Sequence, residues 1–95
     1  MRSIHEQDCP LCSAPAKYKL IDYEERKHFF CKTCIEFVIS LQAEKCLANS
    51  TLQCKAQYSE RAKRSDSESI YHIMMKPQED NAIQGKLVPR STLRL

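Results

Sequence analysis

Two short cysteine motifs, Cys9-Pro10-Leu11-Cys12 and Cys31-Lys32-Thr33-Cys34, are the most informative feature of this sequence. Within each motif, the two intervening residues let both sulfur atoms turn toward one point while backbone N–H groups donate hydrogen bonds to them. Eighteen residues separate the motifs, enough for a hairpin that returns the second pair to the first. The spacing therefore predicts one tetrahedral metal site, whose ligands are Cys9, Cys12, Cys31 and Cys34.

Four thiolates favour a single structural Zn²⁺, because a closed Cys₄ shell leaves no coordination position for a substrate. Three other interpretations of the motifs stay open: a rubredoxin-like iron site, a thioredoxin-like redox pair and a disulfide framework. The iron site has both cysteine pairs on loops, so a helix directly after Cys34 argues against it. The redox pair needs a βαβ context that this sequence lacks, and disulfides need an oxidising compartment.

The other thiols and the histidines give weaker signals. Cys46 shares an apolar helical face with Ile35 and Ile39, which favours a small buried hydrophobic residue. Cys54 points away from the apolar face of its expected helix, and an exposed thiol, an interface residue and a dimer cross-link all stay open. His28 precedes the second motif by three residues and could replace a ligand, although four cysteines already complete the site.

The residues between and after the motifs predict a hairpin and a helix. Residues 18–23 and 27–30 have the composition of two short strands. From Thr33 or Cys34 to about Ala48, apolar residues recur at helical spacing. A helix N-terminus beside the second cysteine pair would stabilise the negative charge of its thiolates.

The second half of the chain predicts one more helix and one strand. Ser50 and Gln53 have the spacing of a capping box, which predicts a helix over about residues 51–64. Residues 70–75 predict a short strand that Pro77 closes. The expected fold is therefore a small α+β domain stabilised by zinc.

Residues 9–48, with cysteine pair, hairpin, cysteine pair and helix in this order, resemble the treble-clef zinc domain. The first pair is similar to the zinc knuckle of that family. Residues 27–45 also resemble small uncharacterised prokaryotic zinc-knuckle proteins, and this resemblance implies no activity. The family often has glycine after the second cysteine of a knuckle, where a positive φ is convenient, whereas this chain has Ser13 and Ile35.

Size and charge limit the function further. The chain has 95 residues, with 15 Lys and Arg against 12 Asp and Glu, and a formal net charge of +3. This length suits one domain and excludes a multidomain enzyme with a deep cofactor cleft. Four thiolates around one divalent ion would lower the net charge by two, to nearly neutral. A nearly neutral protein is a weak candidate for generic nucleic-acid binding, which favours a strongly basic face.

The sequence shows no recognisable catalytic constellation. HNH-type nucleases use a related zinc scaffold, and Asp22 and His28 lie in the expected hairpin, but no Asn or second His follows on the expected helix. A Gly-rich phosphate loop, a Ser-His-Asp set and clustered carboxylates are also missing from the sequence. We therefore predict no enzyme, no catalytic or cofactor-binding residues beyond the zinc ligands, and no small-molecule substrate.

The predicted organisation is a polar lead-in over residues 1–8, a single zinc domain over residues 9–76 and a flexible tail over residues 77–95. Residues 87–91, Leu-Val-Pro-Arg-Ser, are similar to a protease-site linker and are given no functional weight. The sequence has no apolar stretch of membrane-spanning length and no secretory signal. We expect a cytoplasmic location without membrane contact.

The predicted function is that of a non-catalytic zinc module that binds a protein partner or a second copy of itself. Phe37, Leu41 and Ala48 form a second apolar stripe on the expected helix, and this stripe needs cover from elsewhere. The alternative is a nucleic-acid-binding zinc finger with a regulatory role. Basic residues of the hairpin and of the second helix favour that alternative, although acidic residues are interleaved with them; they are Lys17, Lys19, Arg26, Lys27, Lys55, Arg61, Lys63 and Arg64.

Overall fold

The computed structural model describes residues 4–21, 25–75 and 83–93. Within these ranges, six strands form one sheet in the order β1-β2-β3-β4-β5-β6, accompanied by two α-helices and a 3₁₀-helix. The α+β class is confirmed, with a larger sheet than expected. The elements are β1 (His5–Asp8), β2 (Pro15–Ile21), β3 (Arg26–Cys31), β4 (Ile35–Ser40), α1 (Leu41–Ala48), α2 (Leu52–Ala62), β5 (Ser69–Met75), β6 (Ile83–Pro89) and η1 (Arg90–Leu93).

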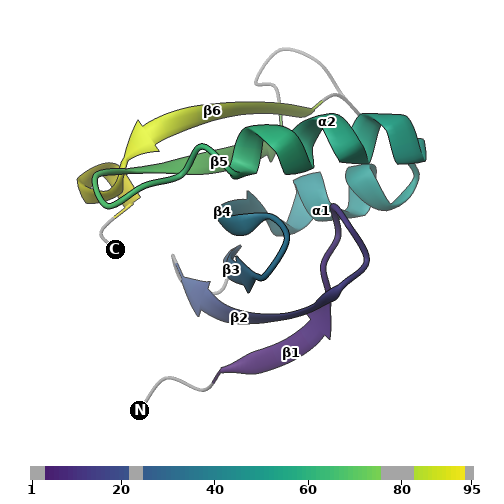
Figure 1. Ribbon diagram of the computed structural model, residues 1–95, viewed down its shortest axis with the longest axis horizontal. Helices are drawn as coiled ribbons and strands as arrows, with labels where there is room; N and C mark the ends of the chain where they lie inside the picture. Colours follow the sequence, from purple (N-terminus) through teal and green to yellow (C-terminus); the bar gives the residue numbers. More distant parts are fainter. Residues whose placement is uncertain (1–3, 22–24, 76–82, 94–95) are drawn as a thin grey trace.

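Neighbouring strands are antiparallel, except that β4 and β5 are parallel. A parallel pair needs a crossover connection, because its strands cannot be joined by a tight turn. Helices α1 and α2 lie in that connection, and both pack against β4 and β5. Figure 1 shows the two helices together beside these strands. One face of the sheet is thereby covered by helices.

The main core lies between this face and the helices. Phe29, Phe37 and Tyr71 come from three adjacent strands and are in register with one another. The rings of Phe29 and Phe37 stack with centroids 5.1 Å apart. Leu47 of α1 and Ala62 of α2 are fully buried in the same core. Aromatic side chains of the sheet therefore hold the helical layer in place.

Residues 35–40 form strand β4, so the predicted helix from Thr33 or Cys34 to Ala48 is wrong over its first part. Residues 37–39 are completely buried, because both faces of β4 are covered. A strand buried on both faces loses polar alternation, and its sequence then resembles an apolar helical segment. The helix begins only at Leu41, where the Ser40 hydroxyl accepts a hydrogen bond of 3.1 Å from the backbone N–H of Ala43.

The second predicted helix, over residues 51–64, corresponds to α2, and the predicted strand over residues 70–75 lies within β5. The N-cap of α2 is Thr51 rather than Ser50. Leu52, at the start of α2, is 80% exposed. None of the helices in the described ranges has the length and apolar character that crossing a membrane requires.

Residues 83–93 belong to the fold, although the sequence predicts a flexible tail from residue 77. Strand β6 pairs with β5 along its length, and Val88 is buried in a second apolar cluster. Arg90 forms a bidentate ion pair with Glu36 of β4, with N–O distances of 2.7 and 2.8 Å. This guanidinium lowers the pKa of the Glu36 carboxyl below its usual value. The segment that is similar to a linker therefore anchors β6 to the sheet.

Phe37 is fully buried and Leu41 half-buried within one chain, whereas Ala48 is exposed. The expectation that these three residues form an uncovered helical stripe is therefore wrong. Phe37 lies on β4, where α1, α2 and the neighbouring strands already cover it. The apolar stripe thus gives no reason for a second copy of the chain.

Gly85 of β6 lies against the ring of Tyr71 on β5. A Cβ added at Gly85 would lie 2.7 Å from Cε2 of Tyr71 and closer still to Cζ and the hydroxyl oxygen. Overpacking of this kind costs about 1–3 kcal/mol. We expect Gly85→Ala to lower the free energy of unfolding by this amount in urea denaturation at fixed metal concentration. Combining it with Tyr71→Leu should recover part of the loss, and strictly additive losses would contradict the clash.

Candidate metal centre

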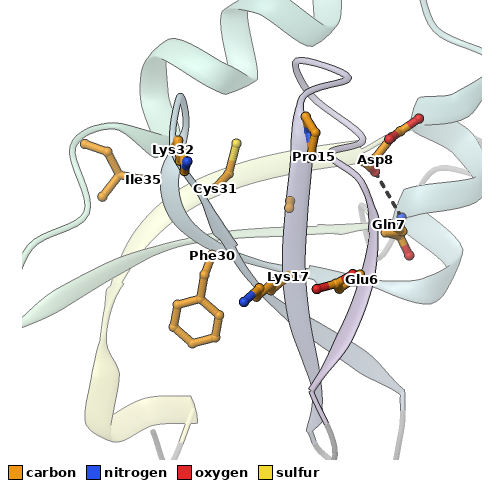
Figure 2. A pocket seen from close by; sticks show the side chains of 10 residues that line it. Glu6, Gln7, Asp8, Pro15, Lys17, Phe30, Cys31, Lys32 and Ile35 are labelled. Carbon is orange, nitrogen blue, oxygen red and sulfur yellow. Dashed lines mark hydrogen bonds between the residues drawn. The ribbon is translucent and has the colours of Figure 1, made fainter.

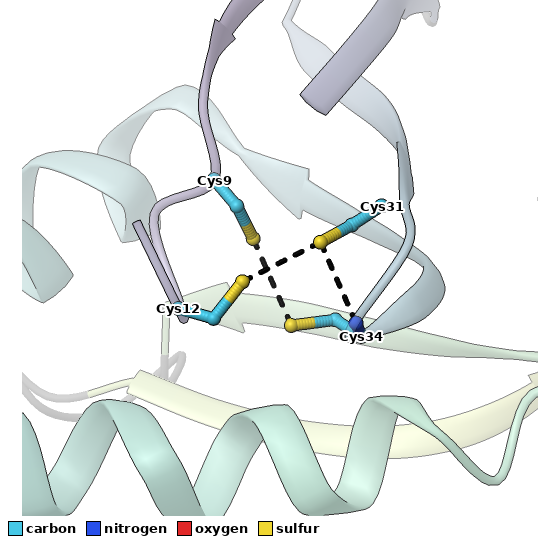
Figure 3. Close-up of side chains that lie close together, drawn as sticks. All are labelled: Cys9, Cys12, Cys31 and Cys34. Carbon is cyan, nitrogen blue, oxygen red and sulfur yellow. Dashed lines mark hydrogen bonds between the residues drawn. The ribbon is translucent and has the colours of Figure 1, made fainter. Parts of the chain in front are cut away.

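The structure brings the four predicted cysteines together (Figure 3). Their sulfur atoms all lie within 4.8 Å of one another. The Cys9 and Cys34 sulfurs are 3.7 Å apart, and those of Cys12 and Cys31 are 3.4 Å apart. A regular tetrahedron of sulfur with metal–sulfur bonds of about 2.3 Å has edges of about 3.8 Å. The cluster therefore has the size of a site for one metal ion.

Each cysteine pair occupies a tight turn between two antiparallel strands. Cys9 and Cys12 lie between β1 and β2, where the N–H of Ser13 donates to the carbonyl oxygen of Cys9 over 2.8 Å. Cys31 is the last residue of β3 and Cys34 directly precedes β4; the N–H of Cys34 is 3.4 Å from the Cys31 sulfur. Pairing of β2 with β3 places the two turns at the same end of the sheet. The sheet therefore positions all four sulfur atoms.

Residues 5–8, predicted as a polar lead-in, contribute directly to this arrangement. They form β1, which pairs with β2 from Asp8 opposite Pro15 to His5 opposite Tyr18. Cys9 follows β1 immediately. The first turn is consequently held by strands on both sides.

Ser13 and Ile35, each directly after the second cysteine of its motif, have positive φ angles of 64° and 71°. These are the two positions at which the resembled knuckles often have glycine. A left-handed conformation is especially unfavourable for a β-branched residue, because its Cβ crowds the backbone. The turn geometry at Ile35 is therefore maintained by its surroundings against the preference of the residue.

We expect Ile35→Gly to raise the free energy of unfolding by about 1 kcal/mol, because glycine adopts positive φ without steric cost. Ile35 is 50% exposed, so only part of its side chain contributes buried surface. Urea denaturation of the metal-loaded protein measures the change. Ile35→Val is the matched control, since it keeps the branched Cβ and should give no gain. A Gly variant less stable than the Val variant would contradict this explanation.

Burial disfavours the charged form of two of the clustered thiols, Cys9 and Cys12. Cys9, Cys31 and Cys34 are nearly or fully buried, and Cys12 is half-buried. The hydrogen bond with Cys34, together with burial, raises the pKa of the Cys9 thiol far above its usual range. Burial likewise raises the pKa of Cys12. A divalent ion bound by the sulfurs would reverse this preference for the neutral thiol, because it would stabilise thiolates and displace their protons.

Ser59 of α2 is a residue of this site that sequence reasoning missed. Its hydroxyl oxygen lies 3.0 Å from the Cys34 sulfur, and the residue is buried at 7% exposure. From the sequence, Ser59 is only one residue within the helix predicted over about residues 51–64. No motif spacing connects it with Cys34, because the contact depends on how α2 packs over the cysteine turns.

The other thiols and His28 are not part of the cluster. Cys46 is half-buried on α1, and Cys54 packs against the main core, although its helical position predicted the opposite face. His28 lies on the opposite face of the sheet from the helices, with Nε2 2.5 Å from a Glu36 carboxylate oxygen. Burial lowers the pKa of His28. His28 thus contacts Glu36 and does not replace a cysteine.

The site thus consists of four convergent sulfur donors from two turns, with one serine hydroxyl beside them. Soft thiolate ligands in this number suit Zn²⁺ or iron. Comparisons of the chain with protein-family models, curated proteins and solved structures found no match. The interpretation of the site therefore depends on its own geometry.

Proposed function

We propose that the chain is a non-catalytic module folded around one structural Zn²⁺ bound by Cys9, Cys12, Cys31 and Cys34. The convergence of the four sulfurs within 4.8 Å carries this proposal. When bound, zinc would supply a cross-link between two turns that are far apart in sequence. All four tetrahedral positions would be filled by protein ligands, so none is left for a substrate. The same Cys₄ set favours a reducing compartment, for which the cytoplasm is the proposed location.

Iron is the alternative ion at the same four sulfurs, and one observation in the structure supports this alternative. The expected helix after Cys34 was the reason against a rubredoxin-like site, but strand β4 follows this cysteine instead. Both cysteine pairs therefore lie in turns between strands. Zinc remains the proposal because a closed Cys₄ set of this spacing is the common structural zinc site.

Elemental analysis and native mass spectrometry of protein purified without added metal distinguish the two ions. One zinc per chain and no absorption in the visible range support the zinc module. One iron per chain, with a coloured protein whose absorption bleaches on reduction, would replace it with an electron-transfer site. Protein that is folded with neither ion would contradict both.

We further propose that the module binds a protein partner through an open hollow beside the second cysteine turn. The hollow has a volume of about 770 Å³, and Figure 2 shows the side chains that line it, among them Phe30 and Ile35. These two side chains are 37% and 50% exposed. An open hollow lined by two exposed apolar side chains can receive an apolar side chain of a partner.

The charges around the hollow favour protein over nucleic acid as the partner. Lys17 and Lys32 line it together with Glu6 and Asp8, so both signs are present. A phosphate backbone is repelled by carboxylates and favours a uniformly basic surface. Titration of labelled protein with short single- and double-stranded oligonucleotides tests the alternative. A salt-dependent shift of the Lys17 resonances would support the nucleic-acid-binding finger instead.

Affinity capture from the native cell tests the protein partner when variants are compared. Phe30→Ser should lose the captured protein, whereas Leu52→Ser, which changes a residue 80% exposed on α2, should keep it. Sedimentation at micromolar concentration distinguishes a second copy of the chain from a different protein. Equal capture by both variants would contradict the assignment of this hollow.

A further inference from the structure

The cysteine cluster is in contact with the helical layer through Ser59 and Cys34. The Ser59 hydroxyl oxygen and the Cys34 sulfur are 3.0 Å apart. Cys34 is 0% exposed and Ser59 only 7%. Solvent therefore has little access to this pair, and an unmade hydrogen bond here would leave a buried polar group without compensation.

Metal binding would fix the direction of this hydrogen bond. In the metal-free protein either the thiol or the hydroxyl can be the donor. A metal-bound cysteine is a thiolate and has no proton to donate, so the donor must then be Ser59. Hydrogen bonds to a charged acceptor are stronger than neutral ones and stabilise the charged form. The contact is consequently strongest when the metal is bound.

Lys63, one turn further along the chain from Ser59, is a less direct neighbour of the cluster. Its ammonium group is 2.9 Å from a Glu60 carboxylate oxygen. The hydrogen bond with Glu60 is the main reason that the pKa of Lys63 is raised. The positive charge of Lys63 is thus largely paired within the helix, whereas the Ser59 hydroxyl contacts the sulfur itself.

We propose that Ser59 is a positioning residue of the metal centre, whose hydroxyl orients the Cys34 thiolate and couples the docking of α2 to metal binding. This proposal rests on the proposed function, since it requires a metal at the four cysteines. Hydrogen bonds to the groups around a metal commonly change its affinity by about 10–100-fold when they are removed. Loss of the hydroxyl should also change the electron density on the sulfur.

Binding of Co²⁺ alone, followed by its sulfur-to-metal charge-transfer absorption, tests the role of Ser59. Ser59→Ala removes the hydroxyl, while Ser59→Thr and Ser59→Val form a matched pair of nearly equal shape that differs in the hydroxyl. We expect Ala and Val to weaken Co²⁺ binding by about 10–100-fold in competition with a chelator. Both should also shift the charge-transfer band, whereas Thr should keep the wild-type band and recover most of the affinity.

A role in packing alone gives a different result. If Thr and Val weaken binding equally and neither shifts the band, or if Ala changes neither quantity, the proposal is overturned. Circular dichroism of the metal-saturated variants identifies any that fail to fold. If Ala or Val is among them, the Co²⁺ affinity and charge-transfer band of Ser59→Thr are compared with those of the wild type, and a loss of both in a folded Thr variant would contradict the proposal. A wild-type chain that binds neither Co²⁺ nor Zn²⁺ would overturn the proposed function itself, and with it the role of Ser59.

Discussion

Replacing Cys34 with serine is expected to abolish stoichiometric zinc binding and to unfold the chain. Cys34 is fully buried, and its sulfur contacts those of the cluster and the hydroxyl of Ser59. Structural zinc contributes about 10–16 kcal/mol in zinc-finger peptides, which matches or exceeds the whole stability of a small domain. Native mass spectrometry counts the zinc, and circular dichroism follows the fold. A strong chelator should unfold the wild-type chain in the same way.

Cys46→Ser and Cys54→Ser are the matched controls for this prediction. Both thiols lie outside the four-sulfur cluster, on α1 and α2. Each variant should therefore retain one zinc per chain and its β-sheet spectrum. If Cys34→Ser instead kept an ordered β2–β3 hairpin without metal, the sheet would be stable by itself and zinc would not be required for folding.

The convergence of the four cysteines could be predicted from sequence because the features that determine it are local. Two residues between cysteines determine the shape of a turn, and one hairpin determines whether two turns meet. Strands β2 and β3 form this hairpin, with Tyr18 opposite Phe29. Neither step depends on distant residues, and for this reason Cys9, Cys12, Cys31 and Cys34 converge as predicted.

The element after the second turn could not be predicted in this way. Residues 37–39 are Phe-Val-Ile, which fit a buried strand and a buried helix equally well. Pairing with β5 favours the strand over the helix. Tyr71 of β5 pairs with Phe37 although 34 positions separate them in the chain. A parallel partner so distant in sequence leaves no periodic signal near β4.

Strand β6 was missed for a related reason. It contains one glycine and ends at Pro89, which makes it resemble a loop. At Gly85 the ring of Tyr71 on β5 leaves no room for a Cβ, and Arg90 pairs with Glu36 of β4, 54 positions earlier in the chain. Composition alone therefore favours a tail where tertiary contacts produce an edge strand.

Phe37→Ala is the second substitution with a large expected effect. The Phe37 side chain is 0% exposed, stacks on Phe29 and lies opposite Tyr71 in the parallel pair of β4 and β5. Truncation of a buried phenylalanine to alanine costs about 3–5 kcal/mol, through lost burial and the cavity left behind. We expect urea denaturation of the zinc-loaded variant to show a loss of this size.

Phe30→Ala is the control for Phe37→Ala, because Phe30 lies on the neighbouring strand with its side chain on the other face of the sheet. It is 37% exposed, and its truncation should cost about 1 kcal/mol. Sedimentation checks that the loss arises within a single chain. In a helix with Phe37 facing a second copy of the chain, Phe37→Ala would yield a stable monomer. In strand β4 it must destabilise the single chain, because α1 and α2 pack against the strand that carries this ring.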